Sequence, residues 1–190
     1  MHVLISVKNL IGRLQSGRLR FEDRQLRVAA ARLRRSIGGE WEDKLGQLIE
    51  SLQLPVRVRC KQIGGRQLSS EQGNSIGDID VLALDRSQHI VWALDAKSIA
   101  PDVTPLSLRA EVRQLEEEIP KHQRRLEWLE RNRDAIVAEF ALGSTNLLNW
   151  EIRGALVLQQ PLGGAFMFEP ALPILTWREL RNEIGCATYE

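Results

Sequence analysis

The chain has 190 residues, 43% of them hydrophobic and 27% charged, which suits one globular domain with a full core. No apolar run approaches the roughly 18 residues that cross a bilayer, the start lacks the build of a secretory signal, and the two cysteines lack zinc-type spacing, so we expect a cytoplasmic protein without membrane spans. The net charge of +1 hides an asymmetry, because residues 1–35 hold nine Lys or Arg against two acids and the remainder is acidic.

The chain begins with a basic helical arm, predicted over residues 1–37. Leu19, Leu26 and Leu33 recur at steps of seven, as they do along one face of a helix. The positive charge would attract a polyanion, although a solvated helix face has the same composition. The apolar stripe can dock on the rest of the chain or on a second copy, which leaves a homodimer open. Because the helical pattern starts almost at Met1, we also expect the chain to be part of a longer protein.

A second domain, residues 38–190, is expected to start with a short helix after Gly38-Gly39. Its apolar stripe runs from Trp41 to Leu52, and Glu42 lies about 80° from the centre of that stripe, at the edge of the buried face. A carboxylate at this edge can reach a neighbouring site. The segments that follow are a half-buried strand at 55–63, where apolar and basic side chains alternate, and a polar loop at 64–75.

Acids and one lysine interrupt the next two apolar runs, which begin at Gly77 and end at Lys97 and which a short turn can fold into a hairpin. If the numbers of paired positions sum to 175, Asp80 lies opposite Asp95, with Asp78 opposite Lys97 on the same face. Two opposed carboxylates, with Cβ atoms about 4.5–5.5 Å apart, repel each other unless a proton or a cation lies between them. A hard divalent cation with oxygen ligands meets this need, and an adjacent ammonium suits a water nucleophile or a phosphate.

The remainder of the chain alternates helices and strands. A loop with two prolines precedes two helices, the second of which is predicted to begin at Pro120. Thr176 and Glu179 match a capping box in front of a last helix. This order favours an α/β fold with a central mixed β-sheet flanked by helices. The expected segments are a loop at 98–107, helices at 108–119 and 120–140, a strand at 152–159, a turn at 161–164, a short strand at 165–168 and a helix after 176.

Together these features resemble the PD-(D/E)XK nuclease superfamily, whose members have the restriction-endonuclease-like fold. The resemblance rests on Glu42 in a first helix, a following strand, the run Gly77-Asp78-Ile79-Asp80-Val81-Leu82, and the segment Asp95-Ala96-Lys97. It extends from about residue 38 to the end of the chain and therefore covers most of the protein.

The resemblance implies a role for each matching residue. Asp80 corresponds to the first acid and Asp95 to the second, and the two would bind Mg²⁺, or alternatively Mn²⁺, together with the backbone carbonyl of Ala96. Lys97 would orient or deprotonate the attacking water and steady the charge on the phosphate. Glu42 would supply a further ligand to the metal or to its water.

Two departures from the family pattern leave alternatives open. The residue before Asp80 is Ile79 instead of proline, so Asp78 competes for the role of first acid. Glu40 can replace Glu42 on the first helix. Position 95 is Asp where many relatives have Glu, which shortens the reach to the metal by one methylene.

Five basic residues outside the motif are candidates for nucleic-acid contacts. Lys121, Arg124 and Arg125 fall on adjoining turns of the helix after the motif strands. Arg57 and Arg59 alternate on one strand and can follow a duplex backbone. A solvated protein face accounts for both groups equally well.

The sequence therefore predicts a metal-dependent nuclease that hydrolyses DNA, with RNA not excluded. The alternative is a non-catalytic nucleic-acid-binding or assembly module that keeps the nuclease fold. A glycosidase built on paired carboxylates is a weaker possibility, because the lysine has no evident role there. Sequence preference and endonuclease or exonuclease action are not readable from the residues.

Overall fold

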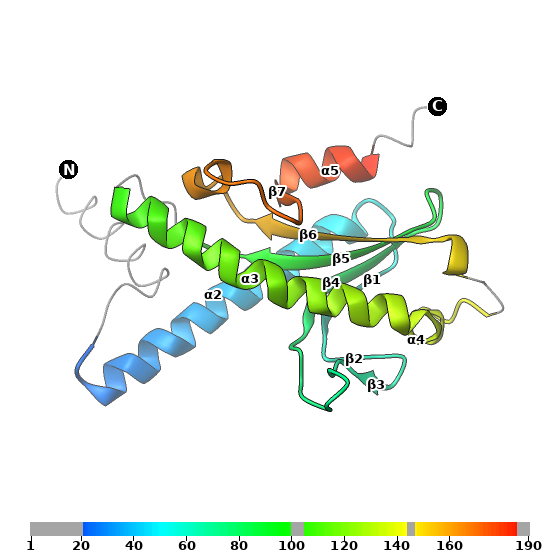
Figure 1. Cartoon of the computed structure of the whole chain (residues 1–190), viewed down its shortest axis with the longest axis horizontal. Coiled ribbons are helices and arrows are strands. Elements are labelled where there is room, and N and C mark those ends of the chain that lie inside the picture. The colour runs from blue at the N-terminus through cyan, green and yellow to red at the C-terminus, as the bar shows by residue number, and fades with distance from the viewer. Residues whose placement is uncertain (1–20, 100–104, 144–146, 186–190) are drawn as a thin grey trace.

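The computed structural model describes residues 21–99, 105–143 and 147–185, and it has an α/β architecture (Figure 1). A five-stranded mixed sheet lies between two helical layers. The predicted class of fold, a central mixed sheet flanked by helices, is confirmed. The helices are α2 (Arg24–Glu50), α3 (Pro105–Arg131), α4 (Arg133–Glu139) and α5 (Trp177–Gly185), and the strands are β1 (Val56–Cys60), β2 (Gln62–Ile63), β3 (Arg66–Gln67), β4 (Ile79–Asp85), β5 (Ile90–Lys97), β6 (Glu151–Leu158) and β7 (Ile174–Thr176).

The main sheet has the strand order β1-β4-β5-β6-β7. Strands β1, β4 and β5 are antiparallel neighbours, whereas β6 and β7 continue the sheet parallel to β5. Val81 pairs with Leu94 and Leu84 pairs with Val91, so the predicted hairpin register is confirmed over the paired residues. Strands β2 and β3 form a separate small hairpin. Strand β2 falls within the strand predicted at 55–63, whereas β3 lies in the segment predicted as a polar loop.

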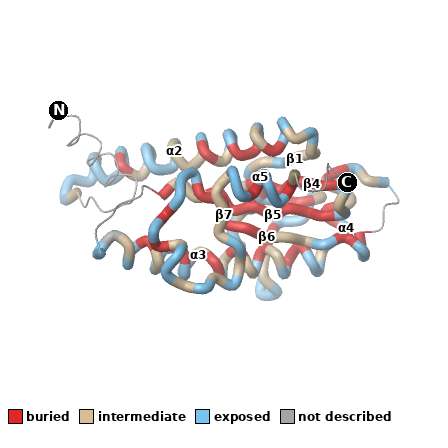
Figure 2. The backbone as a smooth tube through the Cα atoms, turned by 90° about the horizontal axis from the view of Figure 1, so that it is seen from above, coloured by how far each residue is buried: buried red, intermediate tan, exposed pale blue. Residues whose placement is uncertain are grey.

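Different helices cover the two faces of the sheet (Figure 2). Val81 and Ala83 face one side with the apolar residues of α2 and α5, whereas Leu82 and Leu84 face the other side with those of α3 and α4. Successive side chains of a strand alternate between faces, and both faces of β4 are apolar because each is covered by a helical layer. The candidate acids therefore lie near the ends of two strands in a sheet that is covered by helices on both faces.

One uninterrupted helix, α2, replaces the predicted basic arm and short helix. It passes through Gly38 and Gly39, although each glycine costs roughly 1 kcal/mol relative to alanine inside a helix. The buried side chains of Trp41, Leu45 and Ile49 anchor its carboxyl half to the sheet, and helix propagation then carries the pattern across the glycines. The helix is therefore continuous across the expected boundary between residues 37 and 38. Residues 1–20 of the predicted arm lie outside the described residues.

Helix α3 also runs through a predicted break. It begins at Pro105, which was expected inside a loop, and it continues through Pro120 to Arg131. Proline removes one helical hydrogen bond, but Pro120 lies on the exposed side of α3, where water can satisfy the freed carbonyl. The expected division into two helices at residue 120 is therefore wrong, and the break comes later, between α3 and α4.

The carboxyl-terminal part departs from the prediction in two places. Strand β7 at Ile174–Thr176 was not expected. Residues 163–166 form a 3₁₀ helix, η2, instead of the short strand expected at 165–168. The capping box is confirmed, because Glu179 accepts hydrogen bonds from the Thr176 amide at 2.6 Å and from its hydroxyl at 2.8 Å. Among the described residues, no helix is both long enough and apolar enough to cross a membrane.

Candidate functional site

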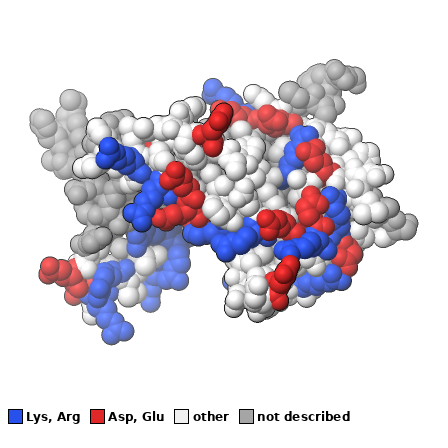
Figure 3. Space-filling model, viewed as in Figure 1, with Lys and Arg blue, Asp and Glu red and all other residues white. Residues whose placement is uncertain are grey.

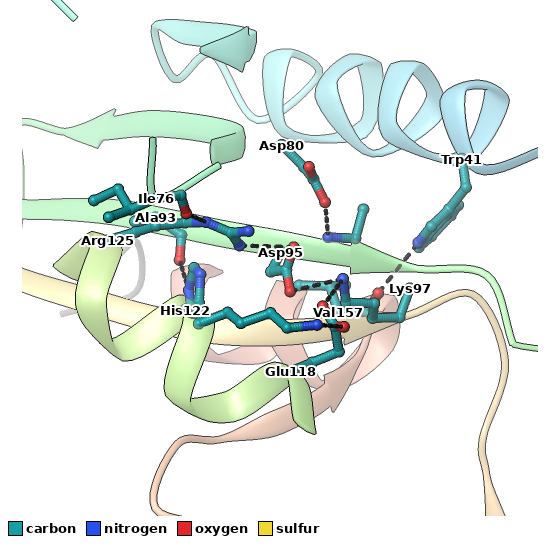
Figure 4. Close-up of polar contacts among 12 residues, drawn as sticks. Trp41, Ile76, Asp80, Ala93, Asp95, Lys97, Glu118, His122, Arg125 and Val157 are labelled. Atoms are coloured by element: carbon teal, nitrogen blue, oxygen red, sulfur yellow. Dashed lines mark hydrogen bonds and ion pairs between the residues drawn. The ribbon is translucent and has the colours of Figure 1, made fainter. Parts of the chain in front are cut away.

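The candidate site lies where β4 and β5 stop pairing with each other. The ladder ends at Val81 and Leu94, and beyond it the carboxylate of Asp80 accepts a hydrogen bond from the Ala96 amide at 2.8 Å (Figure 4). The Asp80 carboxylate thus accepts the hydrogen bond that a backbone carbonyl of β4 would accept if the ladder continued. Because the amide and the carbonyl of one strand residue point to the same side, the Ala96 carbonyl also faces the edge where Asp80 lies. Two oxygen donors thus meet at this edge.

Asp95 lies beside Asp80 and is almost completely buried, with 2% of its surface exposed. Its Oδ2 is 2.9 Å from the ammonium of Lys97, and its Oδ1 is 3.4 Å from a guanidinium nitrogen of Arg125. Burial would raise the pKa of Asp95, but the Lys97 ammonium and the contact with Asp80 hold it below the ordinary value. Asp95 is therefore ionised at neutral pH.

Asp80 behaves in the opposite way. Burial, and then the negative charge of Asp95, raise the pKa of Asp80 to about 8. Two carboxylates so close together cannot both ionise without compensation, and in the absence of a metal the pair therefore keeps one proton at neutral pH. A bound divalent cation would replace that proton.

Lys97 belongs to a chain of charges that continues onto α3. Its ammonium is 2.9 Å from Glu118, which in turn lies 2.6 Å from the ammonium of Lys121. Burial would lower the pKa of Lys97, but Asp95 and Glu118 raise it above the ordinary value. Lys97 is therefore a fixed cation, and Glu118 holds it from the side opposite to the motif acids.

Helix α3 contributes two further buried groups. His122 is fully buried, and its Nε2 is 3.0 Å from the carbonyl of Ala93, so burial lowers the pKa of its imidazole and keeps the ring neutral. Arg125 donates to the carbonyl of Ile76 at 3.1 Å as well as contacting Asp95. Arg125 thus ties the loop before β4 to the acid pair.

The remaining predicted acids are not brought into this group. Glu42 accepts a hydrogen bond from Arg59 at 2.8 Å, and Asp43 accepts another from the same guanidinium. Glu40 is exposed and accepts a bond from the Ser36 hydroxyl at 3.3 Å. No cluster of three or more His, Cys, Asp or Glu side chains suited to a metal ion is present among the described residues. In this structure the carboxylate of Glu42 therefore pairs with Arg59 and does not lie beside Asp80 and Asp95.

Asp78 is half-buried and lines a separate surface cavity of about 270 Å³. Lys61 and Ser75 line the same cavity, which opens beside the loop that precedes β4. The structure therefore separates the two competing first acids: Asp80 contacts Ala96 and Asp95, whereas Asp78 faces this neighbouring hollow.

The five predicted nucleic-acid contacts have different environments. Arg57 pairs with Glu139, Arg59 with Glu42, and Lys121 with Glu118. Arg124 is exposed, at a hollow also lined by Ser70 and Arg131. Arg125 differs from the expected surface position because it is only 8% exposed.

Sequence reasoning missed Glu118, which has no place in the motif. Glu118, His122 and Arg125 are spaced by four and three residues, and this spacing puts all three on one face of a helix. An uninterrupted helix through Pro120 was needed to bring them together, and the predicted break at that proline concealed the pattern.

The donor set fits a hard cation. Asp80, Asp95 and the Ala96 carbonyl would present oxygen ligands, which Mg²⁺ and Mn²⁺ prefer. Oδ2 of Asp95 is buried, and the ammonium of Lys97 lies 2.9 Å from it. No family model, no curated protein and no solved structure matches this chain, so the functional argument depends on this geometry.

Proposed function

We propose that this protein is a metal-dependent nuclease with a restriction-endonuclease-like fold, which hydrolyses phosphodiester bonds of DNA. The observation that carries the proposal is the pair formed by the half-buried Asp80 and the buried Asp95 beside the Lys97 ammonium, at the end of two packed strands. A carboxylate pair of this kind costs stability when it has no cation to bind. A catalytic use accounts for its presence.

The residues divide the chemistry among themselves. Asp80, Asp95 and the Ala96 carbonyl would hold Mg²⁺ or Mn²⁺, which when bound lowers the pKa of a water and stabilises charge on the phosphate. Lys97 remains protonated because Asp95 and Glu118 flank it, so it donates hydrogen bonds to a phosphate oxygen and does not act as the base. Glu118 keeps the Lys97 side chain in place.

The test is a cleavage assay on supercoiled, linear and single-stranded DNA and on RNA, with Mg²⁺, Mn²⁺ or EDTA. Asp80→Asn, Asp95→Asn and Lys97→Ala should each lower the cleavage rate by about 100-fold or more, as expected when a group that stabilises the transition state is removed. Asp43→Asn, a change to an exposed acid that pairs with Arg59, is the matched control and should cleave like the wild type. Wild-type rates in all three site variants would exclude the proposal.

A second candidate is a non-catalytic nucleic-acid-binding or assembly module. The engagement of Glu42 with Arg59, and the lack of a third acid at the pair among the described residues, favour it. Salt-sensitive DNA binding without cleavage in either metal would support this candidate over the nuclease.

A further inference from the structure

The amino-terminal half of α2, residues 24–37, carries five exposed arginines that form no ion pair with an acid among the described residues. Their only polar contact within the described part of the chain is a hydrogen bond from Arg35 Nε to the Ala31 carbonyl at 3.4 Å. We call this set the arm arginines. They are Arg24, Arg27, Arg32, Arg34 and Arg35.

Many arginines in the rest of the domain have a carboxylate partner, so their charge is largely cancelled locally. The arm arginines differ because the described residues place no carboxylate within ion-pair distance of them. Their positive potential therefore extends into solvent over about a Debye length. The paired arginines are Arg57, Arg59, Arg66, Arg113, Arg125, Arg131, Arg133 and Arg153.

The carboxyl end of residues 24–37 lies near the candidate site, and the helix extends away from that site toward Arg24. Trp41, a few residues after the arm, donates from its indole nitrogen to the Val157 carbonyl of β6, the strand next to β5. The amino-terminal half of α2 then projects past the edge of the sheet (Figure 1). Figure 3 shows Lys and Arg side chains gathered on this projection, with a notch between it and the part of the surface that contains β2 and β3.

The distribution of residues around the helix gives the arm a basic side. Arg27 and Arg34 are seven residues apart and lie on one stripe, whereas Leu26 and Leu33 form a second stripe about 100° around the helix from it. Every basic residue on this side is an arginine, and a guanidinium group can form two parallel hydrogen bonds to a phosphate. Phosphate diesters are the anions that this arrangement suits best next to a phosphodiester-cleaving site.

We propose that residues 24–37 of α2 are a docking surface for the phosphate backbone of duplex DNA on one side of the bond that is cleaved. The choice of DNA as the partner and the position of that bond both rest on the proposed nuclease function, whereas the exposed arginine surface itself does not. Eleven residues separate Arg24 from Arg35, which corresponds to about 16 Å along a helix or about five base pairs of duplex. The protein thus contacts DNA well beyond its cleavage site.

The experiment measures binding of a fluorescent duplex of about 24 base pairs by anisotropy, in EDTA so that no cleavage occurs. Arg27→Gln combined with Arg34→Gln should weaken binding about tenfold and reduce the slope of log K against log salt by about two. The matched control combines Arg86→Gln with Arg181→Gln, which are exposed arginines without an ion pair in the described structure, away from the arm. The control should bind like the wild type, and lysine at positions 27 and 34 should preserve the slope.

Equal loss of affinity in the arm and control variants, or no loss in the arm variant, would overturn the inference. The inference would also be overturned if the arginine variant bound phosphatidylserine vesicles less well than the wild type but bound DNA equally well. A third contrary result would be loss of a dimer in the double variant Leu26→Glu with Leu33→Glu, together with unchanged DNA affinity of the arginine variant. Because the assay excludes cleavage, an inactive protein with arm-dependent binding would refute the nuclease and keep the docking surface. The reverse result would keep the nuclease and refute the surface.

Discussion

Replacing Asp80 by asparagine should stabilise the metal-free protein while abolishing its response to Mg²⁺. Asparagine has nearly the same shape as aspartate, and its side-chain oxygen can still accept the 2.8 Å hydrogen bond from the Ala96 amide. Its NH₂ group can also donate toward Asp95, which an ionised Asp80 would repel. The substitution therefore keeps the local geometry and removes only the buried charge.

The size of the effect follows from the raised pKa of Asp80, about 8 against an ordinary value of 3.8. Between these two pH values the folded protein holds a proton that the unfolded chain has released, so the contribution of Asp80 to stability is full below about pH 4 and is lost progressively up to about pH 8. Linkage over this window amounts to several kcal/mol, and relaxation with water entry at the partly exposed carboxyl reduces it to about 2 kcal/mol. The melting temperature of Asp80→Asn should then exceed that of the wild type by about 4–8 °C at pH 8.

Thermal unfolding at pH 5 and pH 8 in EDTA, followed by circular dichroism, measures this difference. The gain should be smaller at pH 5, where the wild type has lost less stability at this site. Adding Mg²⁺ at 100 times its Kd should stabilise the wild type by about 2.7 kcal/mol and leave Asp80→Asn unchanged. Asp43→Asn, at an exposed acid, is the control for a simple change of surface charge. A variant that melts below the wild type at pH 8, or an equal gain at both pH values, would refute the reasoning.

Three further substitutions test the supports of the site. Glu118→Ala removes a partner of the Lys97 ammonium and should reduce kcat about tenfold with little change in KM, whereas Glu118→Gln keeps an acceptor and should retain most of the activity in the same cleavage assay. Gly77→Ala should lower the free energy of unfolding in urea by about 2–3 kcal/mol, because Gly77 has a φ of +91° and an added Cβ would lie 2.7 Å from a nitrogen of Arg125. Gly73→Ala is the control. Gly73 has a φ of +79° and open space around it, so this substitution should lower the free energy of unfolding by only about 1 kcal/mol. Trp41→Phe should lower stability by about 1 kcal/mol, because it removes the buried indole hydrogen bond to β6.

Local patterns were sufficient to predict the strands that carry the motif. The short turn between β4 and β5 fixes which of their residues face each other, because the length of a hairpin turn sets the register of its two strands. The capping box at Thr176 is equally local, since both of its partners lie within one turn. These features depend on residues that are close in sequence, so they could be predicted from the sequence alone.

The helices show what local patterns could not predict. Glycines at 38 and 39 and the proline at 120 are ordinary signals for a helix end, yet both helices continue. Buried residues pack against the sheet after the glycines in α2 and on both sides of Pro120 in α3. Tertiary burial outweighs a propensity cost of about 1–3 kcal/mol. The partners of Lys97 and Asp95 on α3 depended on that continuation, and so they could not be read from the motif alone.

The charges at the site also bear on the choice between enzyme and binding module. A module that only bound nucleic acid would be more stable with an uncharged residue in place of Asp80, because the ionised form of this half-buried carboxylate is repelled by the buried charge of Asp95. The surrounding charges do not neutralise Asp80: Lys97 is shared with Asp95 and Glu118, and Arg125 contacts Asp95. The pair is thus short of positive charge in the position where the Ala96 carbonyl adds a further oxygen, and a divalent cation supplies what is missing. Stability that rises with Mg²⁺ in the wild type, and is lost with either aspartate, is therefore the physical signature that an enzyme should show and a binding module should not.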